Sequence, residues 1–198
     1  EHTDVVLVDD LEREPFSHPR FHYVCGDPAL TSTLERAHIE KAVRAIVLAD
    51  HSIPPVHADG RTLLIASSIE RANPNIYTIV EMMLEEHLDS FEQVKVDEVL
   101  LGDETIARMA ILASHHPGVT KVVTDLLTKD GEGMFSIPTR PEWATYRDAY
   151  HALLEEGVTI LSDGKRLDLN RRLDETIPKN GTLIVLCSEE TASRIGAI

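Results

Sequence analysis

Short apolar runs alternate with helical patterns along the first half of the chain. These runs lie at residues 5–8, 21–25, 45–48, 76–80 and 99–101 and are rich in β-branched and aromatic residues. Such a composition is typical of strands that are buried on both faces of a parallel sheet. The alternation therefore predicts an α/β fold with a Rossmann-like, doubly wound parallel sheet.

Two helices are expected within this part of the chain. Asp27 followed by Pro28 has the form of an N-cap with proline at the first helical position. Asp59 and Gly60 are expected to open the second helix, and residues 73–75 (Asn-Pro-Asn) to stop it. The loop over residues 52–56 is expected to form a mobile lip.

Residues 102–129 show a different pattern, with two apolar stripes at helical spacing on either side of His116, Pro117 and Gly118. This pattern predicts a hairpin of two helices. The apolar positions are Ile106, Met109, Ala110, Ala113, Val119, Val122, Val123, Leu126 and Leu127. Two short helices cannot cover both stripes, so we expect a partner subunit to cover them. Packing of the stripes against the chain's own sheet is the alternative.

The last third of the chain predicts a small α+β unit. Residues 129–133 have the composition of a linker, and residues 146–154 form a helical apolar face that ends before Gly157. Residues 158–161 and 183–186 are predicted strands, with hairpin-type turn residues at 163–164 and 180–181. The expected domains are thus an N-lobe over 1–101, the hairpin over 102–129 and a C-terminal lobe over 130–198.

Acidic residues follow four consecutive predicted strands: Asp9 and Asp10, then Asp27, Asp50 and Glu81. Ligands of open α/β sheets bind beyond the carboxyl ends of the strands. Asp9 or Asp10 suits the acid that accepts the ribose hydroxyls of a dinucleotide. Asp50 and Glu81 suit a hard divalent cation. For any single acid, capping of the following helix is the simpler interpretation.

A Gly-rich phosphate loop of the form G-x-G-x-x-G does not occur in residues 1–198. The first predicted strand already ends in the acid that would accept the ribose hydroxyls, so this strand corresponds to the second strand of a dinucleotide-binding fold. In the order 3-2-1-4-5-6 the first strand is central. We therefore expect a gap between the strands that end at Asp9 and Asp50, to be filled from upstream of Glu1 or by a partner.

Composition narrows the class of partner. The chain has 19 Lys and Arg against 34 Asp and Glu, a formal net charge of −15. This balance argues against nucleic acid and anionic membrane surfaces as partners and favours cations or partners with basic faces. No apolar run reaches the ~18 residues of a membrane span, and no signal-peptide pattern is visible at the start. Cys25 and Cys187 lie in apolar runs, which predicts buried thiols in a reducing compartment.

The histidines offer weaker candidates. His115 and His116 lie at the hairpin turn, where a pair could bind Zn²⁺ or sense pH. The simpler interpretation is polar residues at a helix C-terminus, and it is the one we favour. His51 and His57 flank the loop after Asp50 and are weak metal candidates.

Three stretches, residues 21–50, 59–81 and 96–127, resemble in order the RCK domains (regulators of potassium conductance) and the related KTN subunits of potassium transporters. The segment from Met134 onward is similar to the small C-terminal lobe of that family. The resemblance implies a non-enzymatic, ligand-sensing cytoplasmic domain of an inner-membrane potassium channel. It also implies a homodimer through residues 103–127, an octameric gating ring and attachment to a membrane pore domain.

The resemblance further implies roles for the strand-end acids. In calcium-gated members the motif positions of the ion ligands correspond to Asp50 and Glu81, while the second glutamate of the family falls on Met83. In nucleotide-binding members Asp9 or Asp10 would hold the ribose of NAD, and Asp27 would lie near the base. A peripheral KTN subunit and a nucleotide-dependent oxidoreductase remain alternatives. The absence of a Gly-rich loop and of a clear nucleophile–base pair argues against the oxidoreductase.

Overall fold

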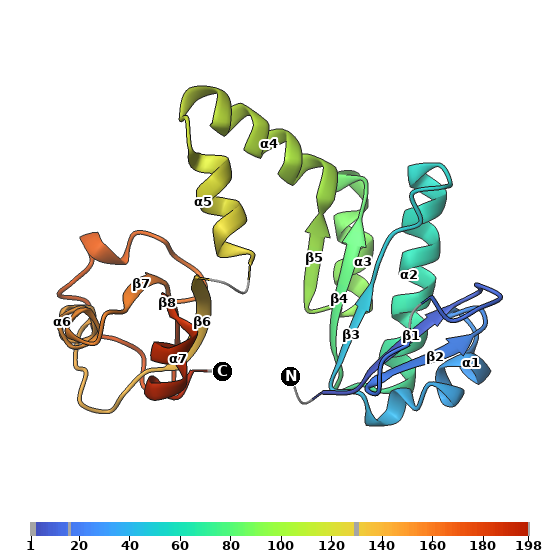
Figure 1. Cartoon of the computed structure of the whole chain (residues 1–198), viewed down its shortest axis with the longest axis horizontal. Coiled ribbons are helices and arrows are strands. Elements are labelled where there is room, and N and C mark those ends of the chain that lie inside the picture. Colours follow the sequence, from blue (N-terminus) through green and yellow to red (C-terminus); the bar gives the residue numbers. More distant parts are fainter. Residues whose placement is uncertain (1–2, 16, 129–130, 198) are drawn as a thin grey trace. The chain divides into compact units, whose positions relative to one another are not determined.

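The chain divides into two compact units, unit 1 (Glu1–Ala110) and unit 2 (Ile111–Ile198). The structure is a computed structural model that describes residues 3–15, 17–128 and 131–197. The boundary between the units falls inside helix α4 (Gly102–His115), which is drawn in yellow-green in Figure 1. One continuous helix therefore belongs to both units.

Unit 1 contains five parallel strands in two sheets. All five predicted strands are present, as β1 (Val5–Asp9), β2 (Phe21–Cys25), β3 (Arg44–Val47), β4 (Tyr77–Met82) and β5 (Glu98–Leu101). β1 pairs only with β2, while the second sheet has the order β3-β4-β5. The fold is therefore α/β and Rossmann-like. The gap expected between the strands that precede Asp10 and Asp50 is confirmed for the described residues, because β1 and β3 are not hydrogen-bonded neighbours.

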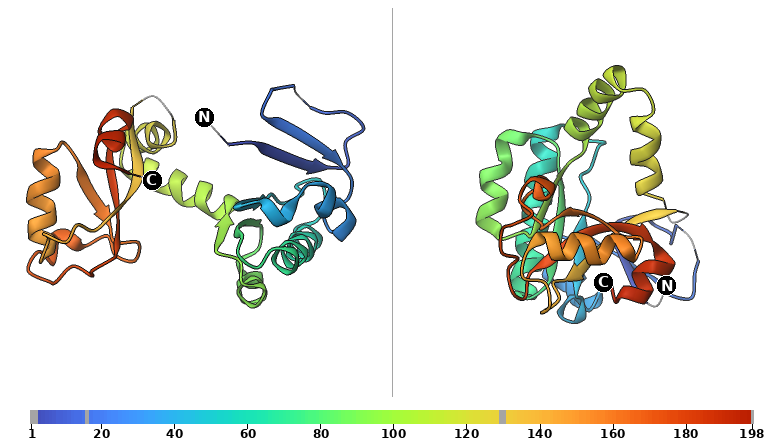
Figure 2. Two further views of the ribbon diagram at one scale, coloured as in Figure 1. Left: turned by 90° about the horizontal axis from the view of Figure 1, so that it is seen from below. Right: turned by 90° about the vertical axis from the view of Figure 1, so that its left-hand side faces the viewer.

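The helices of unit 1 cover one face of the sheet β3-β4-β5. They are α1 (Thr31–Arg36), α2 (Pro55–Ala72) and α3 (Leu88–Val94), with short 3₁₀ helices at Ile39–Lys41 and Glu85–His87. Figure 2 (left) shows α2 and α3 together on one side of these strands. Val47, Val80 and Met82 point to that side and form a core with Ile65 and Phe91.

The opposite face of the sheet β3-β4-β5 is largely bare. Ile46, Leu48 and Leu100 expose 65%, 69% and 48% of their surface. The expectation that the strands would be buried on both faces is therefore wrong for these residues. Alternation along a strand sends neighbouring side chains to opposite faces, and only one face has a layer of helices against it in the described part of the chain.

Two helix starts differ from the sequence-based expectation. α2 begins at Pro55, since proline at the first helical position loses no intrahelical hydrogen bond, and Asp59 lies within the helix. Part of the expected mobile lip is therefore helical. α1 begins at Thr31, with Leu30 as its N-cap residue. Asp27 instead accepts a hydrogen bond from the Ala29 N–H (3.0 Å), so its side chain stabilises a turn before the helix.

The predicted helical hairpin is present as α4 and α5 (Val119–Leu126). The turn between them ends at Gly118, whose φ of 96° lies in the left-handed region that favours glycine. Large apolar side chains along both helices remain exposed, namely Ile106, Ile111, Leu112, Val122 and Leu127.

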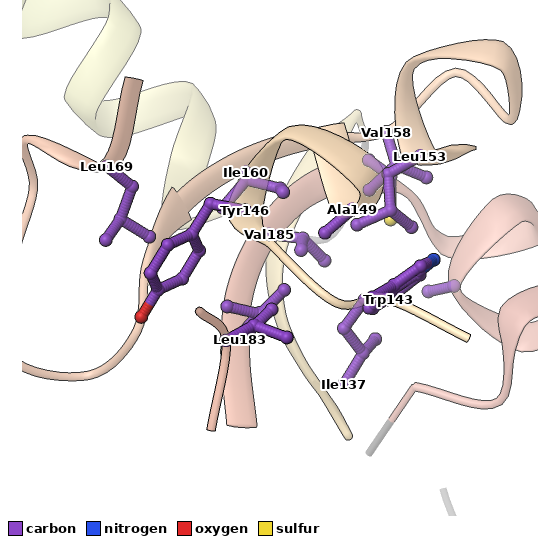
Figure 3. Close-up of a cluster of buried hydrophobic side chains, with 13 residues drawn as sticks. Ile137, Trp143, Tyr146, Ala149, Leu153, Val158, Ile160, Leu169, Leu183 and Val185 are labelled. Carbon is purple, nitrogen blue, oxygen red and sulfur yellow. The ribbon is translucent and has the colours of Figure 1, made fainter. Parts of the chain in front are cut away.

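The described part of unit 2 that follows the hairpin is an antiparallel sheet with two helices. The sheet has the order β6-β8-β7, formed by β6 (Glu132–Pro138), β8 (Thr182–Ser188) and β7 (Thr159–Ser162). The helices are α6 (Tyr146–Glu155) and α7 (Glu189–Ile195), with a short 3₁₀ helix at Leu169–Arg171. Figure 3 shows the core of this unit, where Trp143, Leu153, Leu183 and Val185 converge. The predicted α+β character of this part of the chain is confirmed.

Smaller expectations for unit 2 have mixed outcomes. Glu132 and Gly133 belong to β6 rather than to a linker, while Lys129 and Asp130 lie outside the described residues. Gly157 follows α6 with φ of 78°, as expected of a residue after a helix C-terminus. Residues 163–164 do not form a hairpin turn, because β7 pairs with β8 across the long segment 163–181.

The two cysteines have different environments. Cys187 on β8 is buried, as predicted, whereas Cys25 at the end of β2 is exposed, so that prediction is wrong. Cys25 lies in a two-stranded sheet whose strands are not buried on both faces. In the part of the chain that the structure describes, no helix is long and apolar enough to cross a membrane.

Candidate functional site

The predicted acids lie at the carboxyl ends of the strands in unit 1. Asp9 ends β1, Asp27 follows β2, Asp50 follows β3, and Glu81 is the second-last residue of β4. Since β1 is parallel to β2 and β3 is parallel to β4, each sheet presents its acids at one edge. The Gly26 N–H donates to the Asp9 carbonyl (2.8 Å), which joins the first two strand ends.

Gly26 is required at the end of β2. Its φ of 155° lies within the left-handed region, and a Cβ at this position would lie 2.9 Å from both Thr33 Oγ1 and Arg36 Nη2. Arg36 in turn donates a hydrogen bond to the Cys25 carbonyl. The close approach of α1 to the end of β2 therefore depends on a residue without a side chain.

The positively charged side chain of Arg61 lies near the acids that follow β2 and β3. The Arg61 guanidinium on α2 lies 3.8 Å from the Asp27 carboxylate, and both side chains are close to half exposed. Hydrogen bonds from the Ser52 hydroxyl (2.6 Å) and N–H (2.9 Å) hold the pKa of Asp50 below its usual range, and the positive charge of Arg61 adds to this effect. Arg61 thus interacts with acids from two strand ends.

Glu81 connects three elements. One carboxylate oxygen accepts a hydrogen bond from the Ala49 N–H (2.9 Å), and the other lies 3.0 Å from His51 Nε2. A Cβ on Gly102, the first residue of α4, would lie 3.1 Å from the second oxygen. The carboxylate therefore joins the end of β3 to β4 and lies close to the start of the helix that continues into unit 2.

The proposed cation ligands carry hydrogen bonds of their own. Both Glu81 oxygens and one Asp50 oxygen have partners within unit 1. Across the described ranges, no group of three or more His, Cys, Asp or Glu side chains is arranged to hold a metal ion. Glu85 and Glu86, which lie near in sequence, are exposed. A bound cation at Asp50 and Glu81 would thus compete with existing contacts.

Asp59 is a buried acid, whereas the sequence analysis expected it only to open a helix. Its side chain is 2% exposed and accepts hydrogen bonds from Met83 N–H (2.8 Å) and Leu84 N–H (3.0 Å), with His87 Nδ1 at 2.7 Å. It fixes the segment after β4 against α2. Because α2 starts at Pro55, helical periodicity places Asp59 on the same face as the buried positions 62, 66 and 69. This spacing was the sequence signal that could have predicted its burial.

Asp9 and Asp10, the two acids expected to bind a ribose, lie at the end of β1 and are at least partly exposed to solvent. One Asp9 carboxylate oxygen accepts a hydrogen bond from the Asp10 N–H (2.7 Å), and the Asp9 carbonyl accepts one from the Tyr23 hydroxyl (3.0 Å). Asp10 itself is exposed. Each carboxylate thus keeps acceptor capacity that an approaching diol could use.

Two other features of the chain lie outside this strand-end region. His115 and His116 are exposed, and the His116 N–H donates to the Leu112 carbonyl (2.9 Å) at the end of α4. A hollow of about 410 Å³ is lined by Val43, Arg44 and Tyr77. These residues begin β3 and β4, so the hollow is at the end of the strands opposite the acids.

Comparisons with known sequences identify one relative among curated proteins. The chain is 25% identical over 166 residues to the "putative potassium channel protein YugO" of Bacillus subtilis (strain 168). The matched part is 82% of this chain and 50% of the relative. The chain thus spans about half the length of the curated relative that it matches.

One of the solved structures that the chain resembles shares its fold. The human SLO3 gating ring superposes with a TM-score of 0.75 at 13% identity, covering 98% of this chain and 41% of that one. A GsuK channel structure, described as bound to NAD, gives a TM-score of 0.47 at 19% identity, covering 96% of this chain and 33% of that one. The sequence model of the TrkA-N domain matches residues 1–102. This match covers more than half of the chain, which therefore belongs to the TrkA-N domain family.

Proposed function

We propose that this chain is the ligand-sensing regulatory domain of a potassium channel and that it acts without catalysing a reaction. The observation that carries the proposal is the placement of Glu81, which lies among the strand-end acids and also close to Gly102 at the start of α4. Because α4 continues into unit 2, a change at the strand ends reaches the second unit through one helix. The name of the relative YugO supports a channel as the parent protein.

A nucleotide such as NAD or ADP is the first candidate ligand, on the strength of individual side chains at the strand ends and not of the net charge. Asp9 and Asp10 offer carboxylate oxygens to ribose hydroxyls, and Asp27 follows the next strand, where the base would lie. Arg61 offers a half-exposed guanidinium beside Asp27, and a guanidinium can bind an anionic group through two parallel hydrogen bonds. The site thus combines acceptors for hydroxyls with a donor for an anion.

A divalent cation such as Ca²⁺ is the second candidate ligand. It is favoured by one observation. Asp50 follows β3, Glu81 lies near the end of the neighbouring parallel strand β4, and Glu81 accepts a hydrogen bond from the Ala49 N–H. Carboxylate oxygens at 2.3–2.6 Å are typical ligands of Ca²⁺. Binding there requires Glu81 to release His51, since a cation and the imidazole would compete for the same oxygen.

Ligand binding can act only by favouring one conformation over another. In this proposal the two conformations differ at the first turn of α4, where Glu81 Oε1 lies close to Gly102. A ligand that reorients the Glu81 carboxylate changes the space available to that turn. The helix then transmits the change to unit 2, and in the intact channel to the membrane pore domain.

The proposed assembly is a homodimer through residues 103–127, and in the intact channel an octameric gating ring. Exposed apolar side chains on both hairpin helices support this interface, with Ile106 and Ile111 on α4 and Val122 on α5. A peripheral KTN subunit of a transporter would use the same interface. The cytoplasmic side of the inner membrane is the proposed location in either case.

Isothermal titration of the chain with NAD, ADP, Ca²⁺ and Mg²⁺ tests the ligand. The double variant Asp9→Asn with Asp10→Asn should abolish the heat of nucleotide binding and leave the heat of Ca²⁺ binding unchanged. Asp50→Asn with Glu81→Gln should have the opposite effect. Saturable binding that survives both double variants would contradict the strand-end site, and turnover of a nicotinamide substrate would favour the oxidoreductase.

Light scattering coupled to size exclusion tests the assembly. Ile111→Glu with Val122→Glu places two charges on the exposed apolar side chains and should convert a dimer into a monomer. Thr120→Glu, at an exposed polar position of α5, is the matched control and should leave the mass unchanged. A monomeric parent chain, or a dimer that resists the double variant, would contradict the proposed interface.

A further inference from the structure

The connection between β1 and β2 contains no helix in its described part, residues 10–15 and 17–20. The two strands are parallel, and they lie side by side in Figure 2 (left, blue). Parallel strands are usually joined by a crossover of about a dozen residues or more, most often an α-helix. The segment that follows Asp9 therefore has no helix there to hold it in place.

The side chain of Tyr23 contacts this segment instead. Tyr23 lies on β2, opposite Leu7 of β1. Its hydroxyl lies 2.6 Å from the Leu11 carbonyl oxygen and 3.0 Å from the Asp9 carbonyl oxygen. The two carbonyl groups thus converge on one hydroxyl, which fixes the backbone on both sides of Asp10.

The Tyr23 hydroxyl has one proton to share between these two acceptors. The shorter distance identifies the Leu11 carbonyl as the main partner, since the Asp9 carbonyl also accepts a hydrogen bond from the Gly26 N–H (2.8 Å). Partial burial and the neighbouring Cys25 side chain raise the pKa of Tyr23 above its usual range. The hydroxyl therefore stays protonated at neutral pH and remains a donor.

Asp9 and Asp10, the acids that we propose for the ribose, belong to this segment. The Asp10 N–H donates to one Asp9 carboxylate oxygen (2.7 Å), so the backbone at Asp10 orients the Asp9 side chain. The Asp10 side chain is exposed, so its position also depends on the backbone that carries it. By fixing that backbone, the Tyr23 hydroxyl determines where both carboxylates lie.

Order in this segment matters for binding a diol. The 2′ and 3′ hydroxyls of a ribose have a fixed spacing, and the two acceptor groups must match it. Ordering flexible groups at the moment of binding reduces affinity, and a site that is already ordered avoids this loss.

We propose that Tyr23 is a positioning residue of the nucleotide site, whose hydroxyl orders residues 9–11 so that Asp9 and Asp10 can accept the two hydroxyls of a ribose. Tyr23 acts through the backbone and needs no contact with the nucleotide. The inference rests on the proposed function, because it concerns the same site. The ligand class that it requires is a nucleotide with free 2′ and 3′ hydroxyls.

Isothermal titration of Tyr23→Phe with ADP and with 2′-deoxy-ADP tests the role. The variant keeps the ring and removes only the hydroxyl. Its affinity for ADP should fall by about twofold to tenfold, the range that corresponds to the loss of one net hydrogen bond. The affinity for 2′-deoxy-ADP should change less, because this ligand lacks one of the two hydroxyls. The preference for ADP should therefore shrink, whereas a general loss of stability would weaken both ligands equally.

Tyr77→Phe is the matched control. It removes a hydroxyl that donates to Glu98 (2.8 Å), and Tyr77 is the first residue of β4, at the end of the strands opposite the acids. Both affinities and the preference for ADP should stay as in the parent chain. An equal loss in the two variants would show that Tyr23 stabilises the unit and does not position the site.

Nitrogen-15 relaxation measured by NMR gives a readout that needs no ligand. The backbone order parameters at Asp10 and Leu11 should be near about 0.85 in the parent chain and fall below about 0.6 in Tyr23→Phe. Unchanged order parameters would overturn the inference, even if the variant bound ADP more weakly.

Failure of the inference and failure of the proposed function give different results. If the parent chain binds ADP and Tyr23→Phe binds it equally well, with the same preference over 2′-deoxy-ADP, the positioning role is wrong and the proposed function stands. If the parent chain binds neither ADP nor NAD, the proposed nucleotide site is wrong and the inference falls with it.

Discussion

The carboxylate of Glu81 accepts a hydrogen bond from the backbone N–H of Ala49 (2.9 Å), so a side chain on β4 caps the end of β3. In a parallel sheet the last N–H groups of a strand have no ladder partner unless the neighbouring strand continues. Here Glu81 supplies that partner, and its second oxygen is shared with His51. The same carboxylate that we propose as a ligand group therefore has a structural role in the unliganded domain.

Glu81→Ala is expected to destabilise unit 1. The substitution leaves the Ala49 N–H without its charged acceptor, and a hydrogen bond to a charged group contributes about 1.5–3 kcal/mol. Urea unfolding followed by far-UV circular dichroism measures the loss in the free energy of unfolding. Glu85→Ala is the control, because Glu85 is exposed and belongs to a short 3₁₀ helix nearby. A loss as small as that of the control would show that the contact is dispensable.

Asp59→Ala should cost more stability than Glu81→Ala. Asp59 is almost fully buried and accepts from two backbone N–H groups and lies 2.7 Å from His87 Nδ1, so its removal leaves at least two partly buried donors unpaired. An unpaired buried polar group costs about 1–3 kcal/mol. Chemical denaturation of the variant should therefore show a loss of about 2–6 kcal/mol in the free energy of unfolding for two such donors, or failure to fold.

His87→Ala tests how much the imidazole of His87 contributes to stability compared with the two backbone N–H groups that also donate to Asp59. It keeps the backbone hydrogen bonds to Asp59 and removes only the imidazole, which is itself partly exposed. Its loss should be clearly smaller than that of Asp59→Ala. Equal losses would mean that the imidazole, and not the pair of N–H groups on Met83 and Leu84, provides most of the stabilisation.

The strands and their acidic ends were predictable because they depend on local pattern and on one general rule. Each of the five strands in unit 1 is a short β-branched run, and parallel strands bring their carboxyl ends to the same edge. The start of α2 was not predicted, because residues 52–56 contain two prolines and resemble a loop. The contact of Arg61 with Asp27 depends on how α2 is rotated against the sheet, and sequence spacing alone does not determine that rotation.

The exposure of Cys25 and Ile46 was missed for a different reason. Burial depends on the layer that packs against a strand, whereas an apolar run shows only that a layer is needed. Residues 1–198 supply helices for one face of β3-β4-β5, and the described residues leave the other face open. The sequence pattern was therefore correct about the type of element and wrong about what surrounds it.

Gly26→Ala and Gly60→Ala should change stability in opposite directions. At Gly26 a Cβ would lie 2.9 Å from Thr33 and Arg36, and its φ of 155° is strained for other residues, which costs about 1–3 kcal/mol. Gly60 is inside α2, and a Cβ there meets no atom within 4 Å. Alanine at that helical position should stabilise unit 1 by about 0.5–1 kcal/mol. Thermal melts of both variants measure the sign, and a stabilised Gly26→Ala variant would contradict the packing of α1.

Unit 2 should lose stability in acid through the pair of Glu156 and Arg140. The two side chains form a bidentate contact with N–O distances of 2.7 and 3.1 Å, and the hydrogen bonds from Arg140 lower the pKa of Glu156 from 4.5. A carboxyl group whose pKa is lower in the folded state stabilises the fold above its unfolded pKa. This contribution is lost as the pH falls through the folded pKa, so it is present at pH 7 and disappears below pH 4.5.

The fluorescence of Trp143, the only tryptophan in the chain, reports the unfolding of unit 2, and the Arg140 guanidinium lies 5.0 Å from its ring centre. Urea titrations at pH 7 should show Glu156→Gln to be less stable than the parent chain, and the difference should vanish at a pH well below the folded pKa. Glu155→Gln alters the exposed neighbouring residue and should show no such dependence. A difference between parent and Glu156→Gln that persists unchanged in strong acid would mean that packing of the side chain, and not its charge, stabilises this end of α6.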